Sequence, residues 1–250
     1  PNNTFETAWP ITMPQGVSTF NLPNLKACTT IANDDFFKID VPSYTHIKVD
    51  ITFTMKCDPS NVTCKDPGDL DLYLYDSNKQ LLSNPAVEGT SSSDNETVNY
   101  KNFSNTLKTI YVKIDGYNQS TNTYTLNVAF SCAEDDKEEN DTYSSATILP
   151  DGIEKGPFVV CATDVDWFRL PEVSMSDDIK VTVSFDHSKG DVNAYLYLIG
   201  PGGTPSTPVA IGETTANNEV LEITNANQGF YYLKVITTST YNGYTVTADI

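Results

Sequence analysis

The strongest constraint on this 250-residue chain is that its second half repeats the residue pattern of its first half. Residues 140–146 (Asn-Asp-Thr-Tyr-Ser-Ser-Ala) match residues 2–8, and residues 190–197 (Gly-Asp-Val-Asn-Ala-Tyr-Leu-Tyr) match residues 68–75. A repeat of roughly 120 to 140 residues has the size of a whole domain and is far longer than a solenoid unit. We therefore predict two tandem domains, residues 1–132 and 139–250, with an acidic linker at residues 133–138.

The apolar residues of both halves alternate with polar ones, which predicts half-buried strands. The first half has Ile47, Val49 and Ile51 at alternating positions, and 179–185 is its counterpart in the second half. Clusters of turn-forming residues, such as 91–95 and 200–203, separate the strands at the spacing of an antiparallel sandwich. The expected fold is all-β, with two tandem antiparallel β-sandwiches of jelly-roll-like form.

The charge of the chain excludes some partners. With 15 Lys and Arg against 33 Asp and Glu, the formal net charge is -18, which repels nucleic acid and anionic membrane surfaces. The two histidines, His46 and His187, stand at positions that are not equivalent in the repeats, and no nucleophile elbow, phosphate loop or zinc-protease motif is present. We expect a protein that is not an enzyme and requires no cofactor.

The five cysteines suggest an oxidising compartment. Cys57 and Cys64 enclose a short turn-forming segment, so we expect a disulfide between them. Cys28 and Cys132 stand near the two ends of the first repeat, which predicts a second disulfide. Cys161 is the counterpart of Cys28, but a counterpart of Cys132 would fall two residues beyond Ile250, so Cys161 is expected to be unpaired.

The chain carries six sequons for N-glycosylation, which favours a secretory route. They are at Asn2, Asn61, Asn95, Asn102, Asn118 and Asn140. No stretch of 18 apolar residues is present, so we expect any membrane anchor to lie outside these residues.

A set of tyrosines occupies the outward-facing positions of the expected strands. The set is Tyr73, Tyr75, Tyr111, Tyr195, Tyr197 and Tyr232. Aromatic residues favour strands and pack across neighbouring strands, which is one interpretation. The other is a ligand-binding face, because exposed tyrosine offers rigid contact area with a polar tip.

An acidic run, residues 134–141, leads into the second repeat, and Asp164 and Asp166 stand at its first core strand. Calcium requires six to eight oxygen ligands, which a linker and a loop can supply together. A solvated acidic linker is the alternative interpretation. In the first repeat Asn3 replaces Asp141 and no acidic run precedes it, so we do not expect an equivalent site there.

Several of these motifs together resemble the pre-peptidase C-terminal (PPC) domain. They are Asn140-Asp-Thr with Ala146, Asp164-x-Asp166-Trp-Phe, residues 190–197, Gly229-Phe-Tyr-Tyr-Leu-Lys-Val and Tyr244-Thr-Val. The resemblance covers nearly all of the second repeat and, more loosely, the first, and it implies a jelly-roll-like sandwich. It also implies a calcium site with a set of ligands from the linker and the loop after it. These are Asp136, Glu138, Asn140, Asp141, Asp164 and Asp166, with Asp136 in place of the glutamate of the family pattern.

Two tandem PPC-like copies with many sequons, and with no catalytic domain among these residues, look most like the cysteine protease-binding family of enteric amoebae. That resemblance implies a receptor ectodomain that binds lysosomal hydrolases as protein cargo in the secretory pathway, the lysosome or phagosome, or at the cell surface. The alternative is a collagen- or carbohydrate-binding adhesion module, with glycans as partners.

Overall fold

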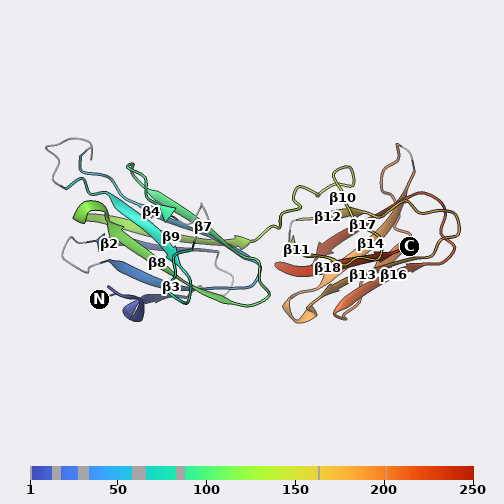
Figure 1. Ribbon diagram of the computed structural model, residues 1–250, viewed down its shortest axis with the longest axis horizontal. Coiled ribbons are helices and arrows are strands. Elements are labelled where there is room, and N and C mark those ends of the chain that lie inside the picture. The colour runs from blue at the N-terminus through green and yellow to red at the C-terminus, as the bar shows by residue number, and fades with distance from the viewer. Residues whose placement is uncertain are drawn as a thin grey trace. The chain divides into compact units, whose positions relative to one another are not determined.

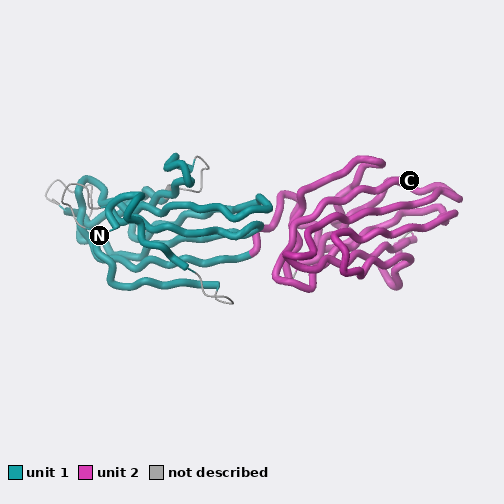
Figure 2. The backbone as a smooth tube through the Cα atoms, turned by 90° about the horizontal axis from the view of Figure 1, so that it is seen from below, with its two compact units in different colours: residues 1–131 teal, residues 132–250 magenta. Residues whose placement is uncertain are grey.

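The chain forms two compact units, residues 1–131 and residues 132–250, which are coloured separately in Figure 2. The computed structural model describes residues 2–12, 18–27, 34–57, 66–82, 88–162, 164–200 and 202–250. The predicted linker, 133–138, belongs to the second unit. No helix in these ranges is long and apolar enough to span a bilayer.

The first unit consists of two sheets (Figure 1). Its five-stranded sheet has the order β1 (Trp9–Ile11), β3 (Asp35–Val41), β8 (Lys108–Gly116), β5 (Leu70–Tyr75) and β6 (Glu88–Gly89). Its four-stranded sheet has the order β2 (Thr19–Ala27), β9 (Asn122–Cys132), β4 (Thr45–Thr52) and β7 (Glu96–Asn102). The described residues of this unit also form two short 3₁₀ helices, η1 (Phe5–Thr7) and η2 (Tyr117–Gln119).

The second unit has the same two sheets. Its five-stranded sheet has the order β10 (Thr147–Ile148), β12 (Asp166–Arg169), β17 (Phe230–Thr237), β14 (Val192–Ile199) and β15 (Ala210–Gly212). Its four-stranded sheet has the order β11 (Lys155–Cys161), β18 (Tyr241–Asp249), β13 (Ile179–Phe185) and β16 (Asn218–Ile223). One 3₁₀ helix, η3 (His187–Lys189), joins β13 to β14.

The strand orders of the two units are identical when each strand is matched to its sequence counterpart, β1 to β10 and so on to β9 and β18. The predicted all-β fold of two sandwiches is therefore confirmed. One detail differs from the expectation, since β1 pairs with β3, and β10 with β12, in parallel. These short strands form the edge of each five-stranded sheet.

Each unit has a hydrophobic core of its own between its two sheets. In the first unit Ile47, Val49 and Ile51 of β4 are fully buried with Leu72 and Leu74 of β5. The equivalent strands β13 and β14 supply the core of the second unit in the same way. The alternation read from the sequence thus corresponds to inward-facing positions.

Two kinds of side-chain hydrogen bond occur at equivalent positions in both units. The Tyr124 hydroxyl donates to Asp35 Oδ2 at 2.6 Å, and its counterpart Tyr244 donates to Asp166 Oδ2, so each pair connects the two sheets of its sandwich. Asn122 Nδ2 donates to two backbone carbonyl oxygens across a loop, as does the equivalent Asn242. Because a buried polar group without a partner is costly, these bonds specify one strand register.

The disulfide pairing differs from the prediction. Cys132 is bonded to Cys161, with Cα atoms 5.9 Å apart, so the predicted bond from Cys28 to Cys132 and the unpaired Cys161 are both wrong. The prediction assumed that pairing stays within a repeat, whereas Cys132, the last residue of β9, belongs to the second unit and is bonded to the last residue of β11. Cys57 is also disulfide-bonded, but Cys64 and Cys28 lie outside the described residues.

Candidate metal centre

The acidic run that opens the second unit is fixed to the sandwich by backbone contacts. Asp135 accepts hydrogen bonds from the backbone N–H groups of Lys137 and Val159, the latter in β11, at 2.8 and 2.7 Å. The carbonyl oxygen of Asn140 accepts from the N–H of Trp167 in β12 at 2.9 Å. The run is therefore held against the sandwich, which excludes a freely solvated linker for these residues.

Three carboxylates converge where this run meets the loop before β12. One oxygen each of Glu138, Asp141 and Asp164 lies within 4.8 Å of the other two. Two oxygens that each lie about 2.4 Å from a calcium ion can be at most about 4.8 Å apart, so the spacing fits a shared cation. Glu138 Oε1 and Asp164 Oδ2 are buried and accept no hydrogen bond from any described residue.

Asn140 and Asp166 extend this group of oxygens. Both side chains are buried, with exposed fractions of 2% and 1%. The Asn140 carboxamide lies 3.2 Å from both Asp166 Oδ1 and Glu138 Oε2. With its nitrogen toward them it donates to both carboxylates, and with its oxygen toward them it would add a further ligand for a hard cation.

The electrostatics of the group favour a bound cation. Burial, followed by the charges of Asp164 and other nearby carboxylates, raises the pKa of Glu138 to about 8. Burial also raises the pKa of Asp166 to about 9, although its bond from Tyr244 acts in the opposite direction. Carboxylates held together in this way repel one another, and a divalent cation would remove that repulsion.

The predicted ligand set is only partly brought together. Asp136 does not join the group, because its side chain is 83% exposed and pairs with Lys137 at 2.9 Å. Asp135 and Glu134, which belong to the predicted acidic run but not to the predicted ligand set, lie near enough to raise the pKa of Glu138. The resemblance assigned the first calcium ligand to Asp136. In the structure the neighbouring Asp135 accepts the hydrogen bonds from backbone N–H groups, and the side chain of Asp136 faces solvent.

No equivalent acidic group is found among the described residues of the first unit. There Asn2 Nδ2 donates to the carbonyl oxygen of Phe36 at 3.1 Å, and Asp35 pairs with Tyr124. The counterpart of Asp141 is Asn3. The first unit therefore keeps the structural part of the motif, including Asp35, but has asparagine at the positions of Asp141 and Asp164.

The six tyrosines of the predicted ligand face lie on the outer surfaces of the five-stranded sheets, where all are half-buried. Two of them contact a ring from the N-terminal segment of their unit, since Phe5 lies 5.1 Å from Tyr75 and 5.3 Å from Tyr111. Tyr143, the counterpart of Phe5, lies 6.2 Å from Tyr232. The remaining three are Tyr197, 5.4 Å from Trp167, and Tyr73 and Tyr195, whose hydroxyls donate to Asp71 and Glu213. Each of the six tyrosines therefore has a ring contact or a hydrogen bond within its own unit, and the ligand-binding face stays a prediction.

The sequons fall into two groups. Asn95 and Asn118 are exposed, and Asn61 lies outside the described residues. Asn102 and Asn140 are only 2% exposed, and the Asn102 amide donates to three backbone carbonyl oxygens, so the folded chain cannot carry a glycan at either. Those two expected glycosylation sites are wrong, and the amide of Asn2 is engaged with Phe36.

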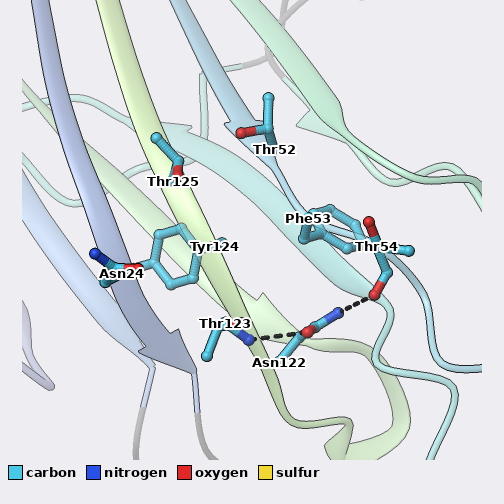
Figure 3. A pocket seen from close by; sticks show the side chains of 8 residues that line it. All are labelled: Asn24, Thr52, Phe53, Thr54, Asn122, Thr123, Tyr124 and Thr125. Carbon is cyan, nitrogen blue, oxygen red and sulfur yellow. Dashed lines mark hydrogen bonds between the residues drawn. The ribbon is translucent and has the colours of Figure 1, made fainter.

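A shallow polar pocket lies on the first unit, far in sequence from the acidic group (Figure 3). It has a volume of about 270 Å³ and is bordered by β4, β9 and the irregularity of β2 between Leu22 and Leu25. Thr52, Thr54 and Thr123 contribute to its lining. The hydroxyl and amide groups of the lining suit a neutral, hydrogen-bonding ligand.

Comparison with solved structures finds low-identity similarity to β-sandwich modules. The PPC domain of a collagenase from Bacillus anthracis is 18% identical over 42% of this chain and 94% of its own, with a TM-score of 0.34. Tandem CBM51 modules of a family 98 glycoside hydrolase from Streptococcus pneumoniae are 10% identical over 84% of this chain and 78% of theirs, with a TM-score of 0.29. The tandem CBM22 modules of Xyn10C from Paenibacillus barcinonensis are 12% identical over 98% of this chain and 94% of theirs, with a TM-score of 0.28.

No protein-family model and no curated protein matches the sequence. The disulfide between Cys132 and Cys161 indicates folding in an oxidising compartment, such as the secretory pathway.

Proposed function

We propose that this chain is a non-catalytic binding ectodomain that captures lysosomal or phagosomal hydrolases, such as cysteine proteases or glycosidases, for transport. Two rigid sandwiches present strand faces and loops, which suits the binding of a protein surface. Calcium bound by Glu138, Asp141 and Asp164 would stabilise the start of the second unit.

The observation that carries the proposal is a group of buried carboxylates in the first unit that favour the folded state when they are protonated. Three carboxylates are at most 7% exposed, namely Asp69 just before β5, Asp71 in β5 and Glu96 in β7. Burial raises the pKa of all three, that of Asp71 to about 6. Protonation of these three carboxyl groups therefore favours the folded state, and their contribution to the stability of this unit increases as the pH falls toward that of a lysosome.

Surface plasmon resonance with the purified chain tests the proposal. The analytes are purified lysosomal cysteine protease and glycosidase, each catalytically inactivated, with serum albumin as the control. We expect saturable binding near neutral pH and weaker binding near pH 4–5, where carboxylates with ordinary pKa values at the interface protonate. Binding no stronger than that of albumin at every pH would refute the function.

The polar pocket of the first unit favours a second candidate, a collagen- or carbohydrate-binding module. Its threonine hydroxyls and the exposed side chain of Asn24 offer donors and acceptors, and its volume of about 270 Å³ would accept part of a glycan. Glycan and collagen arrays distinguish the candidates, because selective array binding without hydrolase binding would replace the first proposal.

A further inference from the structure

The outer surface of the five-stranded sheet in the second unit carries two cations among aromatic rings. Arg169 of β12 is paired in register with Tyr232 of β17, and Trp167 is paired with Lys234. The Arg169 guanidinium lies 5.5 Å from the centre of the Phe230 ring, and the Lys234 ammonium lies 6.0 Å from that of Trp167. We call this surface, formed by β12 and β17 (Figure 1), the cationic face.

Comparison with the first repeat shows what is unusual about these cations. Lys113, the counterpart of Lys234, forms ion pairs with Asp34 and Asp115 at 3.0 and 2.9 Å. The residues at the matching positions of the second repeat are Val165 and Ile236, which carry no charge.

Neither Lys234 nor Arg169 forms an ion pair within the part of the chain that the structure describes. Arg169 Nε is buried and has no hydrogen-bond partner there. A buried donor without a hydrogen-bond partner destabilises the folded chain, and an acceptor on a bound ligand would remove this cost. In a chain with a net charge of -18, two adjacent cations without acidic partners indicate an anionic ligand.

Apolar side chains border the cationic face. Ile148 of β10 and Phe230 are 60% and 41% exposed, and Ile148 is paired in register with Arg169. Trp167 is only 7% exposed, so its ring offers little area for stacking a sugar. Arginine and aromatic residues are enriched where protein interfaces gain most of their binding energy.

We propose that the cationic face binds an acidic polypeptide segment of a partner protein, with carboxylates on Arg169 and Lys234 and an apolar side chain beside Ile148 and Phe230. Arg169 and Lys234 are diagonal neighbours on adjacent strands. Residues in such positions are about 7–8 Å apart, a span that two carboxylates of one extended segment can match. Glu213 accepts a hydrogen bond from Tyr195, which is paired in register with Lys234. The inference deepens the proposed hydrolase binding and rests on it for the identity of the natural partner.

A defined peptide tests the inference without that partner. The probe is a fluorescent peptide of sequence Glu-Glu-Phe-Glu-Glu-Leu-Glu-Glu, with a control peptide in which glutamine replaces every glutamate. In fluorescence anisotropy at low ionic strength, the full chain should bind the acidic peptide at least tenfold more tightly than the control. Absence of that preference overturns the inference, as does preferential binding of a polyuronate oligosaccharide at this face.

Matched variants assign the binding to the cationic face. R169Q and K234Q should each weaken binding about tenfold, since each removes one charge-assisted contact. I236D should have a similar effect although both cations remain, because it gives Lys234 the partner that Asp115 gives Lys113. K113Q is the control and should bind as the wild type does; an equal loss in K113Q, or none in the other three, contradicts the assignment.

The wild-type chain supplies a readout that does not depend on any variant. It has two tryptophans, one in each unit, so its ¹H–¹⁵N spectrum should contain one indole signal from each. The peptide should shift the Trp167 signal and leave that of Trp9 in place, and the opposite result refutes the site. Peptide binding without hydrolase binding would refute only the proposed function, whereas hydrolase binding that survives R169Q and K234Q would refute only the cationic face.

Discussion

Asp71→Asn should stabilise the first unit at neutral pH and have little effect at acid pH. Asp71 is 7% exposed in β5, and the second repeat already has an asparagine, Asn193, at the equivalent position. Burial, followed by the charges of Asp69 and other nearby carboxylates, raises its pKa from 3.8 to about 6. The hydroxyl of Tyr73 donates to Asp71, and the oxygen of an asparagine amide can accept that bond.

The size of the change in the free energy of unfolding follows from the difference in the pKa of Asp71 between the folded and the unfolded chain. Below about pH 4 the carboxyl is protonated in both states, so it does not make stability depend on pH. Between about pH 4 and pH 6 only the folded state keeps the proton, and stability falls as the pH rises. Two pKa units correspond to about 3 kcal/mol, which partial solvent access reduces to about 1–2 kcal/mol.

The assay is urea denaturation at pH 4 and pH 7.5, followed by pulsed hydrogen exchange and mass spectrometry so that each unit is observed separately. Asp71→Asn should raise the stability of the first unit by about 1–2 kcal/mol at pH 7.5 and by much less at pH 4. The reciprocal change, Asn193→Asp, should destabilise the second unit at pH 7.5. An Asp71→Asn effect of equal size at both pH values, or a loss at pH 7.5, would show that burial does not govern this carboxyl.

Three further predictions concern the cation group, the disulfide and the buried sequon. Calcium at a hundred times its dissociation constant should stabilise the second unit by about 2.7 kcal/mol, measured by calorimetry, and Asp164→Asn should reduce this stabilisation. If calcium does not change the stability of the wild-type chain, the site is excluded. Cys161→Ser should cost the second unit about 3–4 kcal/mol, because the disulfide closes a loop with a sequence separation of 29; peptide mapping that finds no link between Cys132 and Cys161 would contradict the pairing. Asn102→Ala should destabilise the first unit by about 2–4 kcal/mol, because it leaves three buried or partly buried carbonyl oxygens without their donor, whereas the exposed Asn118→Ala should cost less than about 0.5 kcal/mol; equal effects in denaturant titration would refute the role of Asn102.

The fold could be predicted because the repeat and the strand pattern are local properties of the sequence. Alternation at Ile47, Val49 and Ile51 reports directly which side of a strand faces the core. The parallel pairing of β1 with β3 was not predicted, because a short edge strand has no pattern of its own that distinguishes parallel from antiparallel pairing.

The candidate site could be predicted only in part, because it depends on how the chain turns. The acidic run and the loop before β12 meet as expected, but the backbone bonds of Asp135 direct Asp136 into solvent. The disulfide pairing was predicted wrongly for the same reason. Alignment of the repeats shows that Cys28 and Cys161 are equivalent, but it does not show which of their sulfur atoms lies near that of Cys132. The missing ion-pair partners of Lys234 could have been found from the sequence by comparing Asp115 with Ile236.

Hydrogen exchange of the full chain, with and without an excess of a purified and inactivated lysosomal hydrolase, tests the central claim most directly. Binding of the hydrolase should slow hydrogen exchange in a defined set of peptides, including those of β12 and β17, while the remainder of both sandwiches exchanges as before. Unchanged exchange throughout both units, at hydrolase concentrations well above those of the secretory pathway, would contradict the claim that this chain holds a hydrolase.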